Sequence, residues 1–235
     1  MEEENNMTPE LLGIIGRSLQ AIGWVFMPFL LVPLLSLFSP KSKFIRSFLT
    51  NLVQIIDGFN MGVGEAVKWL LPLLVVSIAF GVIALSIFGQ AWTKFDESAI
   101  YFHATLILLG SAATLLAGKH VRVDIFHANM PPKSKAFVDF LGFYGLMLPF
   151  CLVLLWNSQS FVALSWASFE GSAESDGIKG LFILKTFVSI FALMMLAQGL
   201  SLAARAALLI NGHALPSLPQ NIDDPFAVKH GGDGL

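Results

Sequence analysis

A short polar motif interrupts the apolar sequence at residues 118–125 and contains side chains that could bind a ligand. It reads Gly118-Lys-His-Val-Arg-Val-Asp-Ile125, so polar and apolar residues alternate. Arg122 and Asp124 can pair with each other or contact lipid phosphates. His120 and Asp124 are four residues apart, as in helical metal sites, but only His127 is near enough to be a third ligand, so a metal site is not favoured. We therefore expect His120, Arg122 and Asp124 to contact another subunit or lipid.

A second polar cluster lies between residues 166 and 185. Trp166 suits a membrane interface, and the long side chain of Lys185 can reach outward to Glu170 or to a lipid headgroup. Ordinary interface anchoring accounts for much of this cluster. The sharper hypothesis is that the loop binds a soluble partner, through Trp166, Glu170, Glu174 and Asp176.

Enzyme signatures are missing from the sequence. It contains no HExxH, GxSxG or CxxC motif, and its single cysteine, Cys151, lies in an apolar stretch. The formal net charge is −2 and the basic residues are scattered, so no nucleic-acid surface is predicted. We expect neither an enzyme nor a bound cofactor.

The elements that hold these polar clusters are apolar segments of membrane-spanning length. Hydrophobic residues make up 55% of the 235 residues and charged residues 13%, with a mean hydropathy of +0.73. About twenty apolar residues form a helix long enough to cross a bilayer. Five stretches reach that length: 18–40, 69–91, 99–118, 140–164 and 177–204.

The distribution of basic residues predicts the orientation of these segments. Most of the 14 lysines and arginines fall in the connections 39–68 and 119–139 and in the C-terminal tail. Basic residues mark the cytoplasmic side, so we place these parts inside and the acidic N-terminus outside. Pro28 and Pro33 would kink a helix over 18–40, which leaves two alternatives open for that segment, a full span or a re-entrant one.

An amphipathic helix is predicted between the first two segments. Its apolar residues recur at helical spacing from Phe44 to Ile56, and Asp57 is assigned with Lys43 and Arg46 to the polar face. We expect this helix to lie on the cytoplasmic membrane surface, on a partner subunit, or on both. A flexible hinge is predicted after it, at Gly58, Gly62 and Gly64.

The spans are poor in groups that could move a solute. Carriers place ionisable side chains near the middle of the membrane, and segments 69–91, 99–118 and 140–164 contain no Asp, Glu, Lys or Arg. An autonomous carrier is therefore not expected. The spans do carry small residues that allow helices to approach closely, partly within the chain and partly toward a partner: Gly110, Ala113, Thr114 and Ala117, and Ser201, Ala204 and Ala207.

Residues 65–210 resemble the DctQ-like small membrane subunit of tripartite ATP-independent periplasmic (TRAP) transporters. The motif 118–125 is the most specific part of this resemblance, followed by Met130-Pro-Pro-Lys-Ser-Lys and Leu148-Pro-Phe. The stretches 165–172 and 184–186, and Gln198-Gly-Leu200, resemble the longer subtype labelled for mannitol or chloroaromatic compounds. In Phe95-Asp-Glu97, the acidic residue matches one that the family has before its second core span.

This resemblance implies an all-α integral membrane protein of the bacterial inner membrane. Its four core transmembrane helices would lie in 69–210. The additional N-terminal hydrophobic segment (1–40) departs from the usual four-helix pattern of the family. The interfacial amphipathic helix with its hinge (41–68) and the flexible tail (211–235) are predicted from the residues themselves. The implied partners are a large membrane subunit that carries solute and sodium sites, a periplasmic substrate-binding protein, and lipid. The solute would typically be an organic acid. Glu97, Gly110 and Lys185 join the motif residues as predicted subunit or lipid contacts.

Another function class remains open from the sequence alone, that of a membrane anchor or adaptor in a different multi-subunit complex. A haem-bearing anchor would need paired histidines within its spans, and His103 is the only histidine inside one.

Overall fold

The computed structural model describes residues 27–118, 130–219 and 222, and within them every regular element is helical. A 3-10 helix, η1 (Met27–Leu31), leads into the short helix α2 (Val32–Phe38), which has Pro33 in its first turn. Proline is tolerated there because the first turn leaves backbone N–H groups unpaired. Residues 18–26 lie outside the described part, so the choice between a full span and a re-entrant segment stays a prediction.

The amphipathic helix is present as α3 (Lys43–Val67), and it is longer than predicted. It begins where the Ser42 hydroxyl accepts a hydrogen bond from the Ile45 N–H, a standard N-terminal cap. The predicted hinge is wrong, because α3 runs unbroken through Gly58, Gly62 and Gly64. Packing overrides the weak helix propensity of glycine: a Cβ on Gly64 would lie 2.5 Å from Ala113 Cβ, so glycine allows α3 to approach the next helix closely.

Four helices long and apolar enough to cross a membrane follow the predicted order. The first is α4 (Leu70–Phe88), which continues from α3 after a break at Lys68 and Trp69. The second, α5 (Thr93–Leu116), begins earlier than predicted and includes Asp96 and Glu97 in its first turns. The third consists of α7 (Pro132–Gly142), a π-helical turn η2 (Phe143–Met147) and α8 (Leu148–Ala167), and the fourth is α9 (Leu181–Ile210). The predicted all-α membrane fold is thus confirmed.

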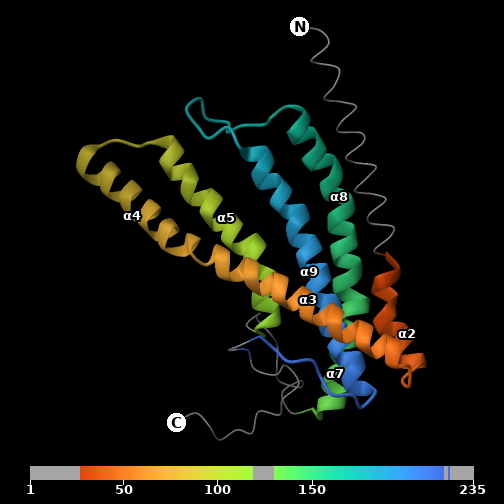
Figure 1. Cartoon of the computed structure of the whole chain (residues 1–235). Helices are drawn as coiled ribbons and strands as arrows, with labels where there is room; N and C mark the ends of the chain where they lie inside the picture. The colour runs from red at the N-terminus through yellow and green to blue at the C-terminus, as the bar shows by residue number, and fades with distance from the viewer. Residues whose placement is uncertain (1–26, 119–129, 220–221, 223–235) are drawn as a thin grey trace, which may run out of the picture.

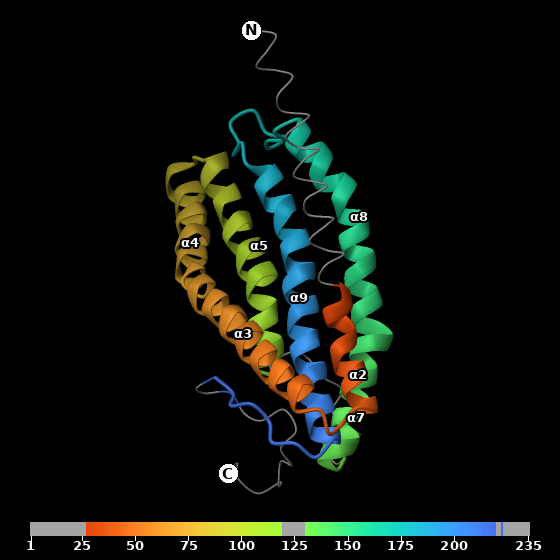
Figure 2. The same cartoon turned by 45° about the vertical axis from the view of Figure 1, so that its right-hand side comes forward.

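These helices pack as one layer in the order α4, α5, α9, α8 (Figures 1 and 2). Helix α3 crosses the layer obliquely and packs on α5 and α9, and α2 packs on α9. The connections 89–92 and 168–180 lie at one end, called here the upper end. Residues 39–42, the start of α7 and residues 211–219 lie at the lower end. Which end faces the cytoplasm stays a prediction.

The core of the layer is richest at the lower end, where small residues allow the helices close contact. Ala203, Ala206 and Ala207 of α9 pack against Phe140 and Phe143 of α7 and η2. Ala204 and Leu208 face Leu49 and Val53 of α3. The small-residue strip of α9 is therefore buried entirely within the chain, whereas Thr114 of the α5 strip is exposed.

Candidate functional site

A buried ion pair between α3 and α9 is the most strongly constrained polar feature of the described chain. Arg205 donates from Nε and Nη2 to Asp57 Oδ2 at 3.2 and 2.6 Å. The two residues are 1% and 2% exposed. A lone charge in such a place would be very unfavourable, so each residue requires the other.

Neutral polar groups complete the coordination of Asp57. Gln198 Nε2 and Ser201 Oγ donate to Asp57 Oδ1 at 2.9 and 2.6 Å. Asn60, one turn after Asp57, donates from Nδ2 to Gln198 Oε1 at 2.7 Å. Both carboxylate oxygens are thereby hydrogen-bonded, as a buried carboxylate requires.

The C-terminal segment closes the network from the lower end. Arg205 Nη1 donates to the Pro216 carbonyl oxygen at 2.8 Å, and Nη2 donates to that of Ser217 at 3.3 Å. Leu215 packs against both core clusters. The guanidinium therefore joins α3, α9 and the segment after α9 at one point.

Sequence reasoning did not find this network. The sequence pattern assigns Asp57 to the polar face of the amphipathic helix. This prediction is wrong, because Leu49, Val53, Asp57 and Asn60 all lie on the buried face. Arg205 lies one residue beyond the predicted last segment, 177–204, but α9 continues to Ile210. A usable signal was present: Gln198, Ser201 and Arg205 recur at i, i+3 and i+7, which places three polar side chains on one helix face.

Glu97 links the start of α5 to the α8–α9 loop at the upper end. Its carboxylate accepts hydrogen bonds from the Ser172 hydroxyl and from the Ile178 N–H, the latter at 2.6 Å. Gly110, also predicted as an interface residue, lies beside α3, where an added Cβ would be 3.6 Å from Val67 Cγ2. Both residues thus make contacts inside the chain, and their role toward a partner stays a prediction.

Lys185 reaches Glu170, which is one of the two partners that the sequence predicts for it, the other being a lipid headgroup. The ammonium group donates a hydrogen bond to the Glu170 carboxylate, and it also lies 4.3 Å from the centre of the Phe161 ring. The hydrogen bond from Lys185 is the main reason why the pKa of Glu170 falls below its ordinary value. The positive charge of Lys185, near the membrane boundary, is thereby paired with the Glu170 carboxylate of the loop.

The remaining predicted docking residues divide into two groups. Trp166 is partly buried, with Nε1 donating to Thr186 Oγ1 at 2.9 Å and its ring edge-on to Phe182. Glu174 and Asp176 are exposed, and Asp176 pairs with Lys94 at 2.8 Å. Trp166 and Glu170 therefore hold the loop in place, while Glu174 and Asp176 remain available at the surface.

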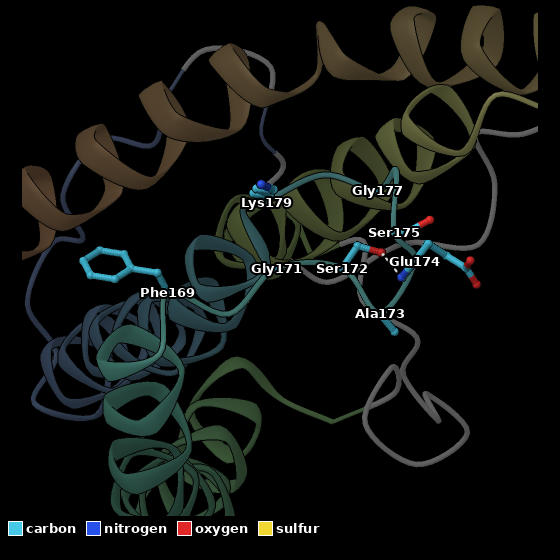
Figure 3. A pocket seen from close by; sticks show the side chains of 8 residues that line it. All are labelled: Phe169, Gly171, Ser172, Ala173, Glu174, Ser175, Gly177 and Lys179. Atoms are coloured by element: carbon cyan, nitrogen blue, oxygen red, sulfur yellow. Dashed lines mark hydrogen bonds between the residues drawn. The ribbon is translucent and has the colours of Figure 1, made fainter.

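An open pocket lies on this loop, at the upper end of the layer (Figure 3). Ser172 Oγ accepts a hydrogen bond from the Glu174 N–H at 3.0 Å and so fixes the turn around it. The loop is consequently a shaped, partly acidic surface rather than a loose connection. The pocket is lined by Phe169, Gly171, Ser172, Ala173, Glu174, Ser175, Gly177 and Lys179.

His120, Arg122 and Asp124 lie outside the described residues. The helix before them, α5, ends at Leu116, and α7 begins after them at Pro132. Their predicted contact with a subunit or lipid therefore stays a prediction.

Comparison with known proteins gives one match. The family model of the DctQ component of tripartite ATP-independent periplasmic transporters matches residues 69–208, which contain α4, α5, α7 and α8 and all but the last two residues of α9. No curated protein and no solved structure matches the chain. The family is one of transporter components, not of enzymes. From this match over more than half of its length, the chain belongs to the DctQ family of TRAP transporter components.

Proposed function

We propose that this chain is a scaffold subunit that braces the large membrane subunit of a TRAP transporter and helps to dock the periplasmic substrate-binding protein. In this proposal the large subunit carries the solute and sodium sites, and the assembly takes up an organic acid with sodium in the bacterial inner membrane. The small subunit does not bind the solute.

The observation that carries this proposal is that Asp57 and Arg205 form a buried ion pair with each other. A carrier must expose ionisable groups to its solute and coupling ion near the middle of the membrane. Here both charges are buried and bonded to each other, and the remaining Asp57 oxygen is occupied by Gln198 and Ser201. Such a network fixes helices relative to one another, which is the work of a static brace.

The apolar surface of the layer supports the first part of the proposal, contact with the large membrane subunit. Helix α4 packs on α5, and its other sides expose large apolar side chains such as Val76 and Ile87. Between helices in lipid, close packing and hydrogen bonds drive association. A one-layer fold offers long helix faces to another membrane protein.

The upper end supports the docking role. Glu174 and Asp176 are exposed on a loop that Glu97, Glu170 and Trp166 hold in a fixed shape. Exposed charges on a rigid surface steer a soluble partner and set its orientation. A binding protein with basic residues around its docking face would fit this loop.

Reconstitution in liposomes tests the proposal. The chain, the large subunit and the binding protein are combined in all pairs and together, and uptake of labelled solute is followed with an imposed sodium gradient. We expect uptake only from the three components together, and stable co-purification of the chain with the large subunit. Solute flux through the chain alone, or failure of the two membrane proteins to co-purify, would overturn the proposal.

A further inference from the structure

Helix α5 has one covered face and one open face. Ala112, Ala113 and Leu116 are buried on the covered face. The open face of α5 is defined here by Ile100, His103, Ile107 and Thr114, which recur at helical spacing and are all exposed. Ile100 and Ile107 are apolar, and His103 and Thr114 are the polar residues of this face.

His103 lies well inside the apolar length of the helix. It is about 9 Å along the axis from Glu97 and about 20 Å from Leu116, at 1.5 Å per residue. No Asp, Glu, Lys or Arg occurs between Ser98 and Gly118. The short imidazole side chain cannot extend over such a distance to the polar headgroups, as a lysine would.

The hydroxyl groups of Thr105 and Thr114 are satisfied by their own helix, and His103 is not. Thr105 donates to the Tyr101 carbonyl oxygen at 2.7 Å, and Thr114 donates to that of Ser111 at 2.8 Å. Within the described chain, no hydrogen bond, ion pair or ring contact involves His103. Imidazole has both a donor and an acceptor to satisfy, and lipid tails supply neither.

We propose that the open face of α5, centred on His103, is a contact surface for a transmembrane helix of the large membrane subunit. That helix would present a hydrogen-bonding side chain to His103, with apolar residues packing on Ile100 and Ile107. Intramembrane histidines normally face other protein, and hydrogen bonds between helices in membranes favour association. The inference rests on the proposed function, because membership in a multi-component transporter is what supplies this partner.

Photo-crosslinking in the intact complex tests the contact. A benzophenone amino acid replaces His103 in one variant and Ile107, one turn further along the same face, in a second. A third variant carries it at Val153, which is exposed on α8. We expect adducts with the large subunit from positions 103 and 107, and at least several-fold less from position 153.

The other outcomes separate this inference from the proposed function. Adducts with a second copy of the chain, equal adducts from position 153, or no protein adduct while the large subunit still co-purifies would each overturn the contact and leave the scaffold role intact. Loss of co-purification in the unmodified chain would instead overturn the scaffold role.

Two substitutions test the hydrogen bond itself. His103→Leu should weaken association with the large subunit about threefold, the size of an average hydrogen bond between membrane helices, while His103→Gln should preserve most of it. Protection of the buried Cys151 thiol from alkylation shows that each variant is folded. Unchanged or tighter association of His103→Leu would contradict the proposal.

Discussion

At the scale of single residues, Asp57 and Arg205 depend on each other more than on anything else in the chain. Removing one partner of a buried pair leaves an uncompensated charge, whereas replacing both with apolar side chains is often nearly neutral. The Asp57→Ala substitution should therefore destabilise the folded chain by about 3–5 kcal/mol. The double variant Asp57→Leu, Arg205→Met should recover most of that loss.

The single cysteine offers the measurement for this prediction. Cys151 is buried, so its reaction with a maleimide dye during heating in detergent reports unfolding. Asp176→Ala is the matched control, because it removes a carboxylate from the exposed pair with Lys94 and should change stability little. An equal shift in both single variants would show that burial of the pair does not matter.

Glu170 gives a prediction on pH. Its pKa lies below the ordinary value of 4.5, chiefly because of the hydrogen bond from Lys185. A carboxyl with a lowered pKa in the folded state stabilises the fold above the unfolded pKa, and that stabilisation disappears as the pH falls through the folded pKa. Wild type should thus be more thermostable than Glu170→Gln at pH 7, and the difference should shrink below pH 4.5. A difference that stays constant from pH 7 into acid would contradict this account.

At the scale of elements, the crossing of α9 with η2 depends on a glycine. A Cβ on Gly199 would lie 2.6 Å from Phe143 Cδ2 and 2.8 Å from Met147 Sδ. Gly199→Ala should therefore destabilise the protein by about 1–3 kcal/mol through overpacking. Gly62→Ala is the matched control, because a Cβ there meets nothing within 4 Å and the better helix propensity of alanine should stabilise α3 slightly. The same Cys151 assay measures both variants, and equal effects would refute the close approach.

The segment after α9 is a further element whose role is testable. Removing residues 213–235 takes away the two carbonyl groups that bind Arg205, and it should destabilise the fold by about 1–3 kcal/mol, the range for losing partners of a buried polar group. Removing residues 223–235 keeps those carbonyls and is the control. If both truncations unfold at the temperature of the full chain, residues 213–219 do not support Arg205.

The difference between what could and could not be predicted at this scale has a physical basis. Hydropathy located the spanning helices because a lipid environment demands long apolar segments. The sequence pattern puts Asp57 on the wrong face of α3 and predicts a glycine hinge that is absent, because both features depend on what α3 packs against. The position of Arg205 and the approach of Gly64 to Ala113 are contacts between segments far apart in sequence, and no local pattern contains them. Glu170 is among the predicted partners of Lys185 because only the α8–α9 loop separates the two residues.

At the scale of the whole molecule, the one-layer arrangement separates two tasks. The long helices expose large apolar side chains along their length, and the α8–α9 loop lies at the upper end of the layer (Figure 2). The chain's own buried charges hold the layer and α3 together without a partner. A subunit built in this way can remain rigid while another subunit moves.

The docking role proposed for the upper end gives the last prediction. Glu174→Lys reverses an exposed charge on the α8–α9 loop without breaking a side-chain bond of the described chain. Charges at the edge of an interface act mainly on the association rate and on its salt dependence. In the reconstituted transporter, this variant should need a few-fold higher concentration of binding protein for half-maximal uptake, and added salt should reduce the difference. Glu65→Lys makes the same charge change at the α3–α4 junction, away from the loop, and should leave that concentration unchanged. If the two variants behave alike, the loop is not where the binding protein docks.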